Sequence, residues 1–209
     1  LVGAALDGAR LVGADLRGAD LSWAGLRHAD LSAAELAGAN LTRAELCAAE
    51  LPAADLSDAD LTAADARETV AMCARLDRCR LVRTDLRWAR LDHAVLAGAD
   101  ASGARFDGAV LVGADLSSVR LSPATALRQA FLHGCRLAGT PLTRGHVAEG
   151  VGEEWCDPRR AAETYRCLAA KFAYDRRLAD SAWAWRMFAR MLFCGHRRSA
   201  ARGRDTRPA

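Results

Sequence analysis

The sequence lacks the features that mark several classes of protein. No uncharged run approaches the roughly 18 residues that a membrane-spanning helix needs. The first residues lack the charged start, apolar middle and cleavage site of a secretion signal. The seven cysteines are an odd number and none forms a CxxC pair, so neither a disulfide framework nor a zinc site is indicated. We therefore expect a cytoplasmic protein with small buried thiols.

Residues that could carry catalysis are sparse and scattered. None of the five histidines lies at a triad-like spacing from a serine, cysteine or carboxylate, and no glycine-rich loop has the pattern of a phosphate-binding site. Aromatic residues make up only 6% of the chain. Few of them accompany the arginines, so the sequence does not favour recognition of nucleic-acid bases by stacking. The sequence thus predicts no catalytic residues, no cofactor and no metal site.

The sequence is instead dominated by a period of five residues. Among the 25 positions from 1 to 121 that are five apart, 21 are leucine. The four exceptions are Ala66, Ala71, Ala101 and Phe106. The position two residues before each of these is alanine in 20 of 24 cases. The chain therefore requires one large and one small apolar group, always two residues apart and always repeated after five.

A period of five fits neither of the regular secondary structures. Five residues of an α-helix turn the chain by about 500°, which would scatter the leucines around the helix. On a strand, an odd period would send alternate leucines to opposite faces. A backbone that turns a corner every five residues sends each leucine and alanine inward, and four such sides close a coil of about twenty residues. Such coils stack at the strand spacing of ~4.8 Å, with hydrogen bonds between them.

The segments "AGANL", "AADLSDADL" and "GADLS" follow the pattern Ala-(Asp or Asn)-Leu-x-x and resemble the pentapeptide repeat family. The resemblance covers about two-thirds of the chain and implies an all-β solenoid, a right-handed quadrilateral β-helix. An extra residue in "SPATAL" shifts the leucines by one after Leu121, and the repeats then continue to Leu142. This gives about seven coils over residues 1–142. Because the sequence begins in mid-repeat without methionine, we expect the native start to lie upstream.

Two helices are predicted after the repeats. Residues 143–156 form a linker, and residues 157–195 form a helical hairpin that caps the last coil, since the ends of a stacked solenoid need caps. Asp157 is the expected N-cap of the first helix and Pro158 its first residue. Gly195 is placed to end the second helix.

The second helix of the hairpin carries two apolar stripes. The first consists of Leu178, Ala182, Trp185, Phe188 and Leu192. The second consists of Trp183, Met187 and Met191. A helix that is apolar over so much of its circumference does not lie half in water. Three interpretations of the second stripe remain open: burial, a homodimer or partner contact, and, favoured least, a membrane-surface contact assisted by residues 196–209, which we expect to be a basic, disordered tail.

The charges are distributed unevenly along the chain. Residues 1–65 carry a net charge of −7, residues 66–142 a net charge of +4 and residues 143–209 a net charge of +6. Residues about twenty apart should stack on neighbouring coils. This stacking predicts three acidic ladders, which are Asp15, Glu35 and Asp55; Glu45, Asp65 and Asp85; and Asp30 and Glu50. The ladders are either a solvated face or an extended negative surface for a basic partner.

The resemblance suggests a function of a specific kind. Some members of the family are dimeric rods whose acidic surface imitates duplex DNA, and they bind DNA gyrase and protect it from quinolones or related poisons. The negative N-terminal half fits this picture, but the seven arginines between residues 67 and 90 depart from it. We therefore favour a non-enzymatic interaction or scaffold rod whose partner is another protein, with the DNA-mimicking binder of gyrase or topoisomerase as the alternative. Direct nucleic-acid binding through these arginines and the tail would show steep salt dependence and is favoured less.

Overall fold

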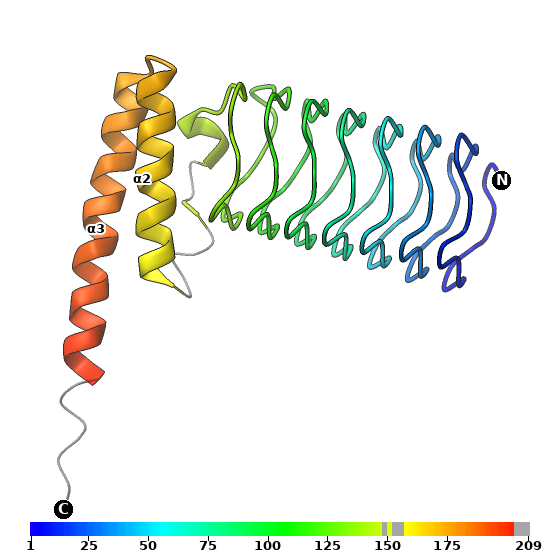
Figure 1. Cartoon of the computed structure of the whole chain (residues 1–209), viewed down its shortest axis with the longest axis horizontal. Helices are drawn as coiled ribbons and strands as arrows, with labels where there is room; N and C mark the ends of the chain where they lie inside the picture. The colour runs from blue at the N-terminus through cyan, green and yellow to red at the C-terminus, as the bar shows by residue number, and fades with distance from the viewer. Residues whose placement is uncertain (148–149, 152–156, 203–209) are drawn as a thin grey trace, which may run out of the picture.

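A computed structural model describes residues 1–147, 150–151 and 157–202, with side chains up to Met191. The repeats form a rod of stacked coils, and two α-helices pack against one end of it (Figure 1). The N-terminus lies at the opposite end of the rod. The repeats and the helices are thus two consecutive parts of one elongated molecule.

Neighbouring coils are joined by parallel bridges between residues 20 apart in the chain, such as Asp15 with Glu35. The backbone groups beside each bridge form hydrogen bonds to the next coil, and the amide of Leu16 donates to the carbonyl of Glu35 at 2.8 Å. Within the described residues these contacts are isolated single-residue bridges rather than longer strands. The spacing of the bridges agrees with the predicted coil of about twenty residues, each straight segment of which is very short.

Each corner of a coil is a tight turn. The amide of the alanine donates to the carbonyl of the leucine three residues earlier, as in Ala14 to Leu11 at 3.1 Å. The residue before the alanine has a positive φ, for example 63° at Trp88, as the third residue of a type II turn does. At Gly108 an added Cβ would lie 2.3 Å from the ring of Trp88 in the preceding coil. Glycine is therefore required where an aromatic ring of one coil covers the corner of the next.

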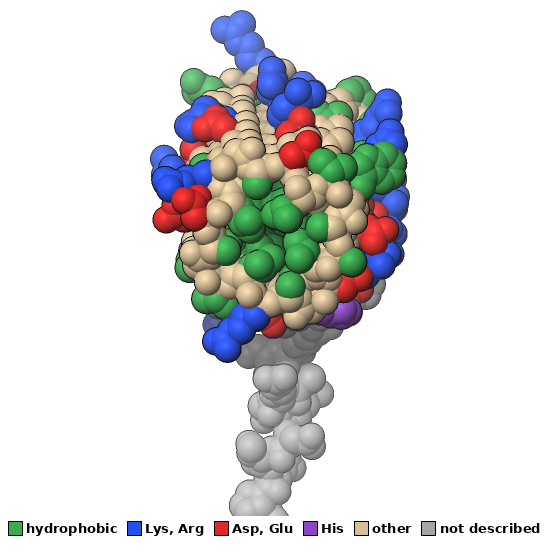
Figure 2. Space-filling model, turned by 90° about the vertical axis from the view of Figure 1, so that its right-hand side faces the viewer, with side chains coloured by type: hydrophobic (Ala, Val, Ile, Leu, Met, Phe, Trp, Pro, Cys, Tyr) green, Lys and Arg blue, Asp and Glu red, His purple; other side chains and the backbone are tan. Residues whose placement is uncertain are grey.

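The leucines and alanines of the repeats fill the interior of the rod, as predicted. Leu36 and Ala39, for example, have no solvent exposure. At the N-terminal end the interior is open, and apolar side chains lie in the centre of a ring of backbone (Figure 2). Leu1 at this end is 59% exposed. The large and small apolar positions of the repeat are thus the two inward positions of each side.

The predicted shift of register after Leu121 is confirmed. Bridges before the shift join residues 20 apart, and those from Arg105–Ala126 onward join residues 21 apart. Thr125 supports the extra residue with its buried hydroxyl, which donates to a carbonyl of the preceding coil at 2.8 Å. The same hydroxyl accepts a hydrogen bond from the amide of Gly103 at 3.1 Å. The longer corner is therefore satisfied by side-chain hydrogen bonds.

Polar residues that replace alanine in the repeat are also held by hydrogen bonds inside the rod. The thiol of Cys79 donates to the carbonyl of Leu56 at 2.7 Å, and the hydroxyl of Thr84 donates to the carbonyl of Leu61 at 2.7 Å. Burial raises the pKa of the Cys79 thiol to about 12, so this thiol stays protonated. The prediction of buried thiols holds for Cys79, whereas Cys73, for example, is exposed at a corner.

Three helical segments follow the rod within the described residues. They are the short 3-10 helix η1 (Arg144–Val147), α2 (Pro158–Tyr174) and α3 (Leu178–Arg202). Asp157 caps α2 as predicted, since its side chain accepts hydrogen bonds from the amides of Arg159 and Arg160. Pro158 is the first residue of α2, a position at which no backbone donor is lost.

α3 is longer than predicted. It continues through Gly195 to Arg202, so the predicted end at Gly195 is wrong and the first residues of the predicted disordered tail are helical. A glycine inside a helix costs only about 1 kcal/mol and stops the helix only where the chain also adopts a left-handed cap. The remaining tail residues 203–209 and the linker residues 148–149 and 152–156 lie outside the described residues.

α2 and α3 form an antiparallel pair across the end of the rod (Figure 1). α2 lies next to the last coil, and Leu168 of α2 lines a small cavity together with Leu132 of the rod. α3 packs against α2, and the hydroxyl of Ser181 donates to the carbonyl of Ala169 at 3.0 Å. The apolar residues of α2 that recur at helical spacing are buried, namely Ala161, Tyr165, Leu168 and Phe172.

His146 in η1 ties the helical part to the rod. Its ring is buried, and Nδ1 accepts a hydrogen bond from the amide of Thr143 at 2.9 Å. The proton is therefore on Nε2, which donates to the carbonyl of Ser122 at 3.0 Å. Burial lowers the pKa of His146 below its ordinary value; the hydrogen bond to Ser122 opposes this shift and the positive charge of Arg177 adds to it. The folded protein thus holds the neutral imidazole.

Acidification is expected to destabilise this junction. The pKa of His146 is lower in the folded state than in the unfolded state. The stability that the neutral ring contributes is therefore fully present above the unfolded-state pKa of about 6.5. That contribution is lost as the pH falls through the folded-state pKa. The wild-type protein should therefore lose more thermal stability between pH 7.5 and pH 5 than His146→Gln does, measured by circular dichroism. Equal losses would contradict a titrating role for His146.

Candidate interaction surfaces

The predicted acidic ladders exist as columns of bridged residues along the rod. The three columns are Asp15, Glu35 and Asp55; Glu45, Asp65 and Asp85; and Asp30 and Glu50. We name them the Asp15, Glu45 and Asp30 columns. The stacking predicted from the coil length is therefore confirmed, and the arginines beside each column decide how much negative charge it presents.

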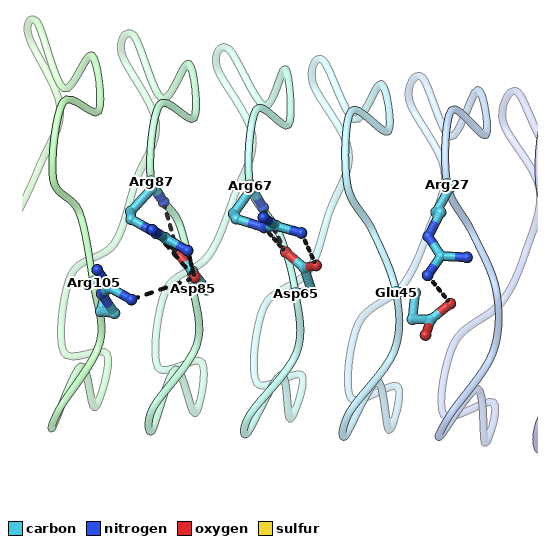
Figure 3. A network of polar contacts seen from close by, with 7 residues as sticks. All are labelled: Arg27, Glu45, Asp65, Arg67, Asp85, Arg87 and Arg105. Atoms are coloured by element: carbon cyan, nitrogen blue, oxygen red, sulfur yellow. Dashed lines mark hydrogen bonds and ion pairs between the residues drawn. The ribbon is translucent and has the colours of Figure 1, made fainter.

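Each carboxylate of the Glu45 column has an arginine partner (Figure 3). The closest nitrogen–oxygen distances are 2.8 Å in Arg27–Glu45 and 2.7 Å in both Arg67–Asp65 and Arg87–Asp85. The next residue of the column is Arg105, which lies 3.9 Å from the carboxylate of Asp85. This side of the rod is therefore a series of ion pairs and not a negative strip.

Arginines also compensate the Asp15 column. Arg17 donates two hydrogen bonds to the carboxylate of Asp15, at 2.9 and 2.7 Å, and its Nε lies 3.1 Å from a carboxylate oxygen of Glu35. Asp55 is followed in the column by Arg75, whose Nη1 lies 3.2 Å from its carboxylate. The hydrogen bonds from Arg17 lower the pKa of Asp15 to about 2.

Removing the arginine should return the pKa of Asp15 toward its ordinary value. In Arg17→Gln we expect the pKa to rise from about 2 to just below 3.8, because the amide of residue 17 still donates to Asp15 Oδ1. The measurement is an NMR titration of the Asp15 carboxyl carbon, with Arg27→Gln as the control that leaves Asp15 untouched. An unchanged pKa in Arg17→Gln would show that Arg17 does not contact Asp15 in solution.

The Asp30 column keeps its negative charge. The carboxylate of Asp30 accepts hydrogen bonds from the hydroxyl and the amide of Ser32, which lower the pKa of Asp30. Among the described residues, neither Asp30 nor Glu50 forms an ion pair. Asp20, half a coil from Asp30, likewise accepts a hydrogen bond from the side-chain amide Nδ2 of Asn40 at 3.0 Å and has no ion pair in the described part of the chain. The carboxylates without arginine partners therefore face opposite sides of the rod.

The arginines between residues 67 and 90 are engaged in ion pairs. Six of the seven pair with carboxylates, in Arg67–Asp65, Arg75–Asp55, Arg78–Asp58, Arg80–Asp60, Arg87–Asp85 and Arg90–Asp92. Two spacings recur: an arginine two residues from an acid on the same side, and an arginine 20 residues after an acid on the next coil. These spacings are visible in the sequence and could have identified the pairs, whereas the net charge of the segment could not.

The two stripes of α3 differ in exposure, although Phe188 of the first stripe is partly buried against the core. Trp183 and Met191 are only 8% and 6% exposed, and Met187 is partly buried against the core. Leu178 and Trp185 of the first stripe, by contrast, are 75% and 47% exposed. The stripe offered as a dimer or partner contact is therefore core, and the stripe that remains available to a partner is the other one.

The rotation of α3 is set by its contacts with α2 and η1. The rings of Trp183 and Tyr165 meet edge to face with centroids 5.6 Å apart, and the guanidinium of Arg144 lies 5.5 Å from the Trp183 ring. The hydroxyl of Tyr165 accepts a hydrogen bond from the amide of Val151 at 3.3 Å. These contacts turn Trp183 inward, and Trp185, about 200° further around the helix, consequently points outward.

Other kinds of site find little support in the described part of the chain. No group of three or more His, Cys, Asp or Glu side chains there could hold a metal ion. None of its helices combines the length and apolar character needed to cross a membrane. Two cavities there, of about 30 Å³ beside α2 and about 10 Å³ inside the last coils, are too small for anything larger than a few water molecules.

Comparison with protein-family models identifies the repeats. A model described as pentapeptide repeats matches residues 1–32, 24–62, 53–87 and 84–122, with 8 copies. Comparison with curated protein sequences gave no significant match.

Several solved structures are similar to the chain. HetL, a pentapeptide repeat protein involved in heterocyst differentiation regulation from the cyanobacterium Nostoc sp. strain PCC 7120, is 34% identical over 66% of this chain and 70% of HetL, with a TM-score of 0.38. A pentapeptide repeat protein from the thylakoid lumen of Arabidopsis thaliana is 30% identical over 56% of this chain and 68% of its own, with a TM-score of 0.26. QnrB1, a plasmid-mediated fluoroquinolone resistance protein, is 22% identical over 70% of this chain and 86% of its own, with a TM-score of 0.30.

Proposed function

Because the chain belongs to the pentapeptide repeat family, we propose that it is a non-enzymatic rod for protein interaction, built as a right-handed quadrilateral β-helix of about seven coils. α2 and α3 close one end of this rod. The partner is another protein, which recognises the pattern of side chains on one or more of the four sides.

The observation that carries this proposal is the fixed arrangement of side chains on the outside of the rod. The guanidinium of Arg78, for example, lies 2.7 Å from the carboxylate of Asp58 on the preceding coil and 2.9 Å from that of Asp77. The carboxylate of Asp60 accepts a hydrogen bond from the amide of Thr62 at 2.9 Å. Side chains that are restrained by such contacts lose less conformational entropy on binding than unrestrained ones, which favours recognition by a protein partner.

The test is affinity capture with the wild-type protein and four variants, each of which alters one side of the rod. The variants are Arg27→Gln/Arg67→Gln, Asp30→Asn/Glu50→Gln, Arg17→Gln/Arg75→Gln and Asp20→Asn/Asp60→Asn. We expect a partner that the wild type retains and that one or two of the variants lose, with unchanged melting temperatures. A partner retained equally by all four variants would contradict recognition through the sides of the rod.

A DNA-mimicking binder of DNA gyrase is the second candidate. It is favoured by the carboxylates of the N-terminal half that have no ion pair among the described residues, namely Asp20, Asp30 and Glu50. These carboxylates face two sides of the rod, and those of the Glu45 column between them are paired with arginines. A continuous negative face would therefore need a second copy, and we rank this candidate below the general interaction rod.

A gyrase supercoiling assay, with and without a quinolone, distinguishes the two candidates. Inhibition or protection that disappears in Asp30→Asn/Glu50→Gln and persists in Arg27→Gln/Arg67→Gln would favour the gyrase function. The absence of any effect at micromolar wild-type protein would eliminate it and leave the interaction rod.

A further inference from the structure

The outward side of α3 is an exposed apolar stripe. We name as the outer stripe the residues that recur there at helical spacing, Leu178, Ala182, Trp185 and Ala189. Leu178 is 75% exposed and Trp185 is 47% exposed. Tyr174 at the end of α2 is 87% exposed, and the ring of Phe188 supports that of Trp185 edge to face at 5.3 Å. Leu192, the next position of the stripe, lies beyond the described side chains. Exposed apolar side chains gathered in this way mark a binding surface.

The charges around the outer stripe are positive. Arg176, Arg186 and Arg190 have no carboxylate within ion-pair distance among the described residues. Asp175, beside Arg176, and Asp180, in the first turn of α3, are engaged in ion pairs of their own. An occupant of this surface must therefore offer negative charge beside apolar volume.

The position of α3 leaves the outer stripe accessible to a flat surface. α3 is the outermost element at its end of the molecule, and its axis runs across the rod (Figure 1). The coils extend away on the other side of α2. A plane can therefore touch α3 along its length without meeting the coils.

We propose that the outer stripe and its flanking arginines dock α3 onto an anionic lipid bilayer, with the helix in the plane of the headgroups and the rod projecting from the surface. Leu178 and Trp185 enter the boundary between headgroups and acyl chains, and the arginines contact lipid phosphates. A bilayer presents negative charge and apolar volume side by side along a plane, which matches the features of α3. A second copy of the chain matches them less well, because it would bring two sets of unpaired arginines together.

The test is co-sedimentation of the full chain with vesicles of phosphatidylcholine alone and of phosphatidylcholine mixed with phosphatidylglycerol. The wild type should bind the mixed vesicles, with an affinity that falls as the salt concentration is raised. It should not bind vesicles of phosphatidylcholine alone. Trp185→Ser and Leu178→Ser should each weaken binding by about tenfold, because each removes a large apolar side chain from the contact. Trp88→Ser, which removes a tryptophan that is 58% exposed on the rod, should bind as the wild type does.

A charge reversal tests the arginines separately. Arg186→Glu/Arg190→Glu should weaken binding to the mixed vesicles by more than about tenfold. Arg43→Glu/Arg83→Glu, two exposed arginines at corners of the rod, makes the same change in net charge and should have little effect. Equal loss in both double variants would show that net charge alone drives binding and would overturn the proposal.

Three further outcomes would also overturn it. The first is that the wild type fails to bind mixed vesicles. The second is that both Trp185→Ser and Leu178→Ser bind as the wild type does. The third is that the wild type dimerises without lipid and Trp185→Ser does not, which would assign the stripe to a second copy. Thermal unfolding of each variant shows that it is folded, and Leu178→Ser changes a side chain too exposed to matter for folding.

Discussion

Leu36→Lys is expected to unfold the coils around residue 36. Leu36 has no solvent exposure, and its neighbours on the adjoining coils, Leu16 and Leu56, are also leucines. An ammonium group in this interior would find no partner and would cost at least about 4 kcal/mol of unfolding free energy. Because each coil is stabilised only by its neighbours, the loss should spread in both directions. Guanidinium unfolding followed by circular dichroism measures it.

The matched control for this prediction is Ala33→Lys, on the same side of the same coil. Ala33 is an exposed corner residue with a φ of 54°, so a lysine there changes neither the interior nor the type of backbone conformation. We expect a change within about 0.5 kcal/mol. If Leu36→Lys unfolded at the same denaturant concentration as the wild type, the inward orientation of the leucines would be incorrect.

The rod could be predicted from the sequence because the same packing requirement recurs every five residues. Each side of a coil needs one large and one small inward residue, and only a corner every five residues supplies both. The shift of register after Leu121 can also be read from the sequence, since an inserted residue moves every later leucine by one position. The stacking of Asp15 on Glu35 follows from the same length of coil.

The charge of the surface could be predicted only in part. The columns of acidic residues follow from backbone geometry, but whether a column is negative depends on long arginine side chains. Arg17 reaches both Asp15 on its own coil and Glu35 on the next, and this depends on the conformation of a flexible side chain. The segment sums of charge therefore suggested a negative half and a basic belt, whereas the structure has ion pairs distributed along the rod.

The orientation of α3 could not be predicted, because its two stripes are similarly apolar. Trp183 and Trp185 are the same residue type, so hydrophobicity alone does not distinguish the buried one from the exposed one. The choice is made by tertiary contacts, above all the edge-to-face packing of Trp183 on Tyr165. Gly195 is a similar case, since nothing in its local sequence shows that the helix continues.

Trp183→Ala is therefore expected to be the most damaging of the simple truncations in the helical part. The Trp183 ring is 8% exposed and packs against both Tyr165 and the guanidinium of Arg144, so its removal should cost about 3–5 kcal/mol of unfolding free energy. Trp185→Ala removes the same side chain from the exposed stripe and should cost less than about 1 kcal/mol. Thermal unfolding and amide hydrogen exchange of α2 and α3 measure the difference.

The part of the molecule that Trp183→Ala destabilises is as informative as the size of the loss in unfolding free energy. In a stacked rod the damage from Trp183→Ala should be confined to the helices and the last coils, so amides of the first coils should exchange as in the wild type. Equal effects of Trp183→Ala and Trp185→Ala would mean that α3 is rotated differently in solution. The comparison also bears on the surface of α3, because Trp183 fixes the rotation that turns Leu178 and Trp185 outward. Without the Trp183 ring, the outer stripe should consequently no longer be an ordered surface, even if the rod remains folded.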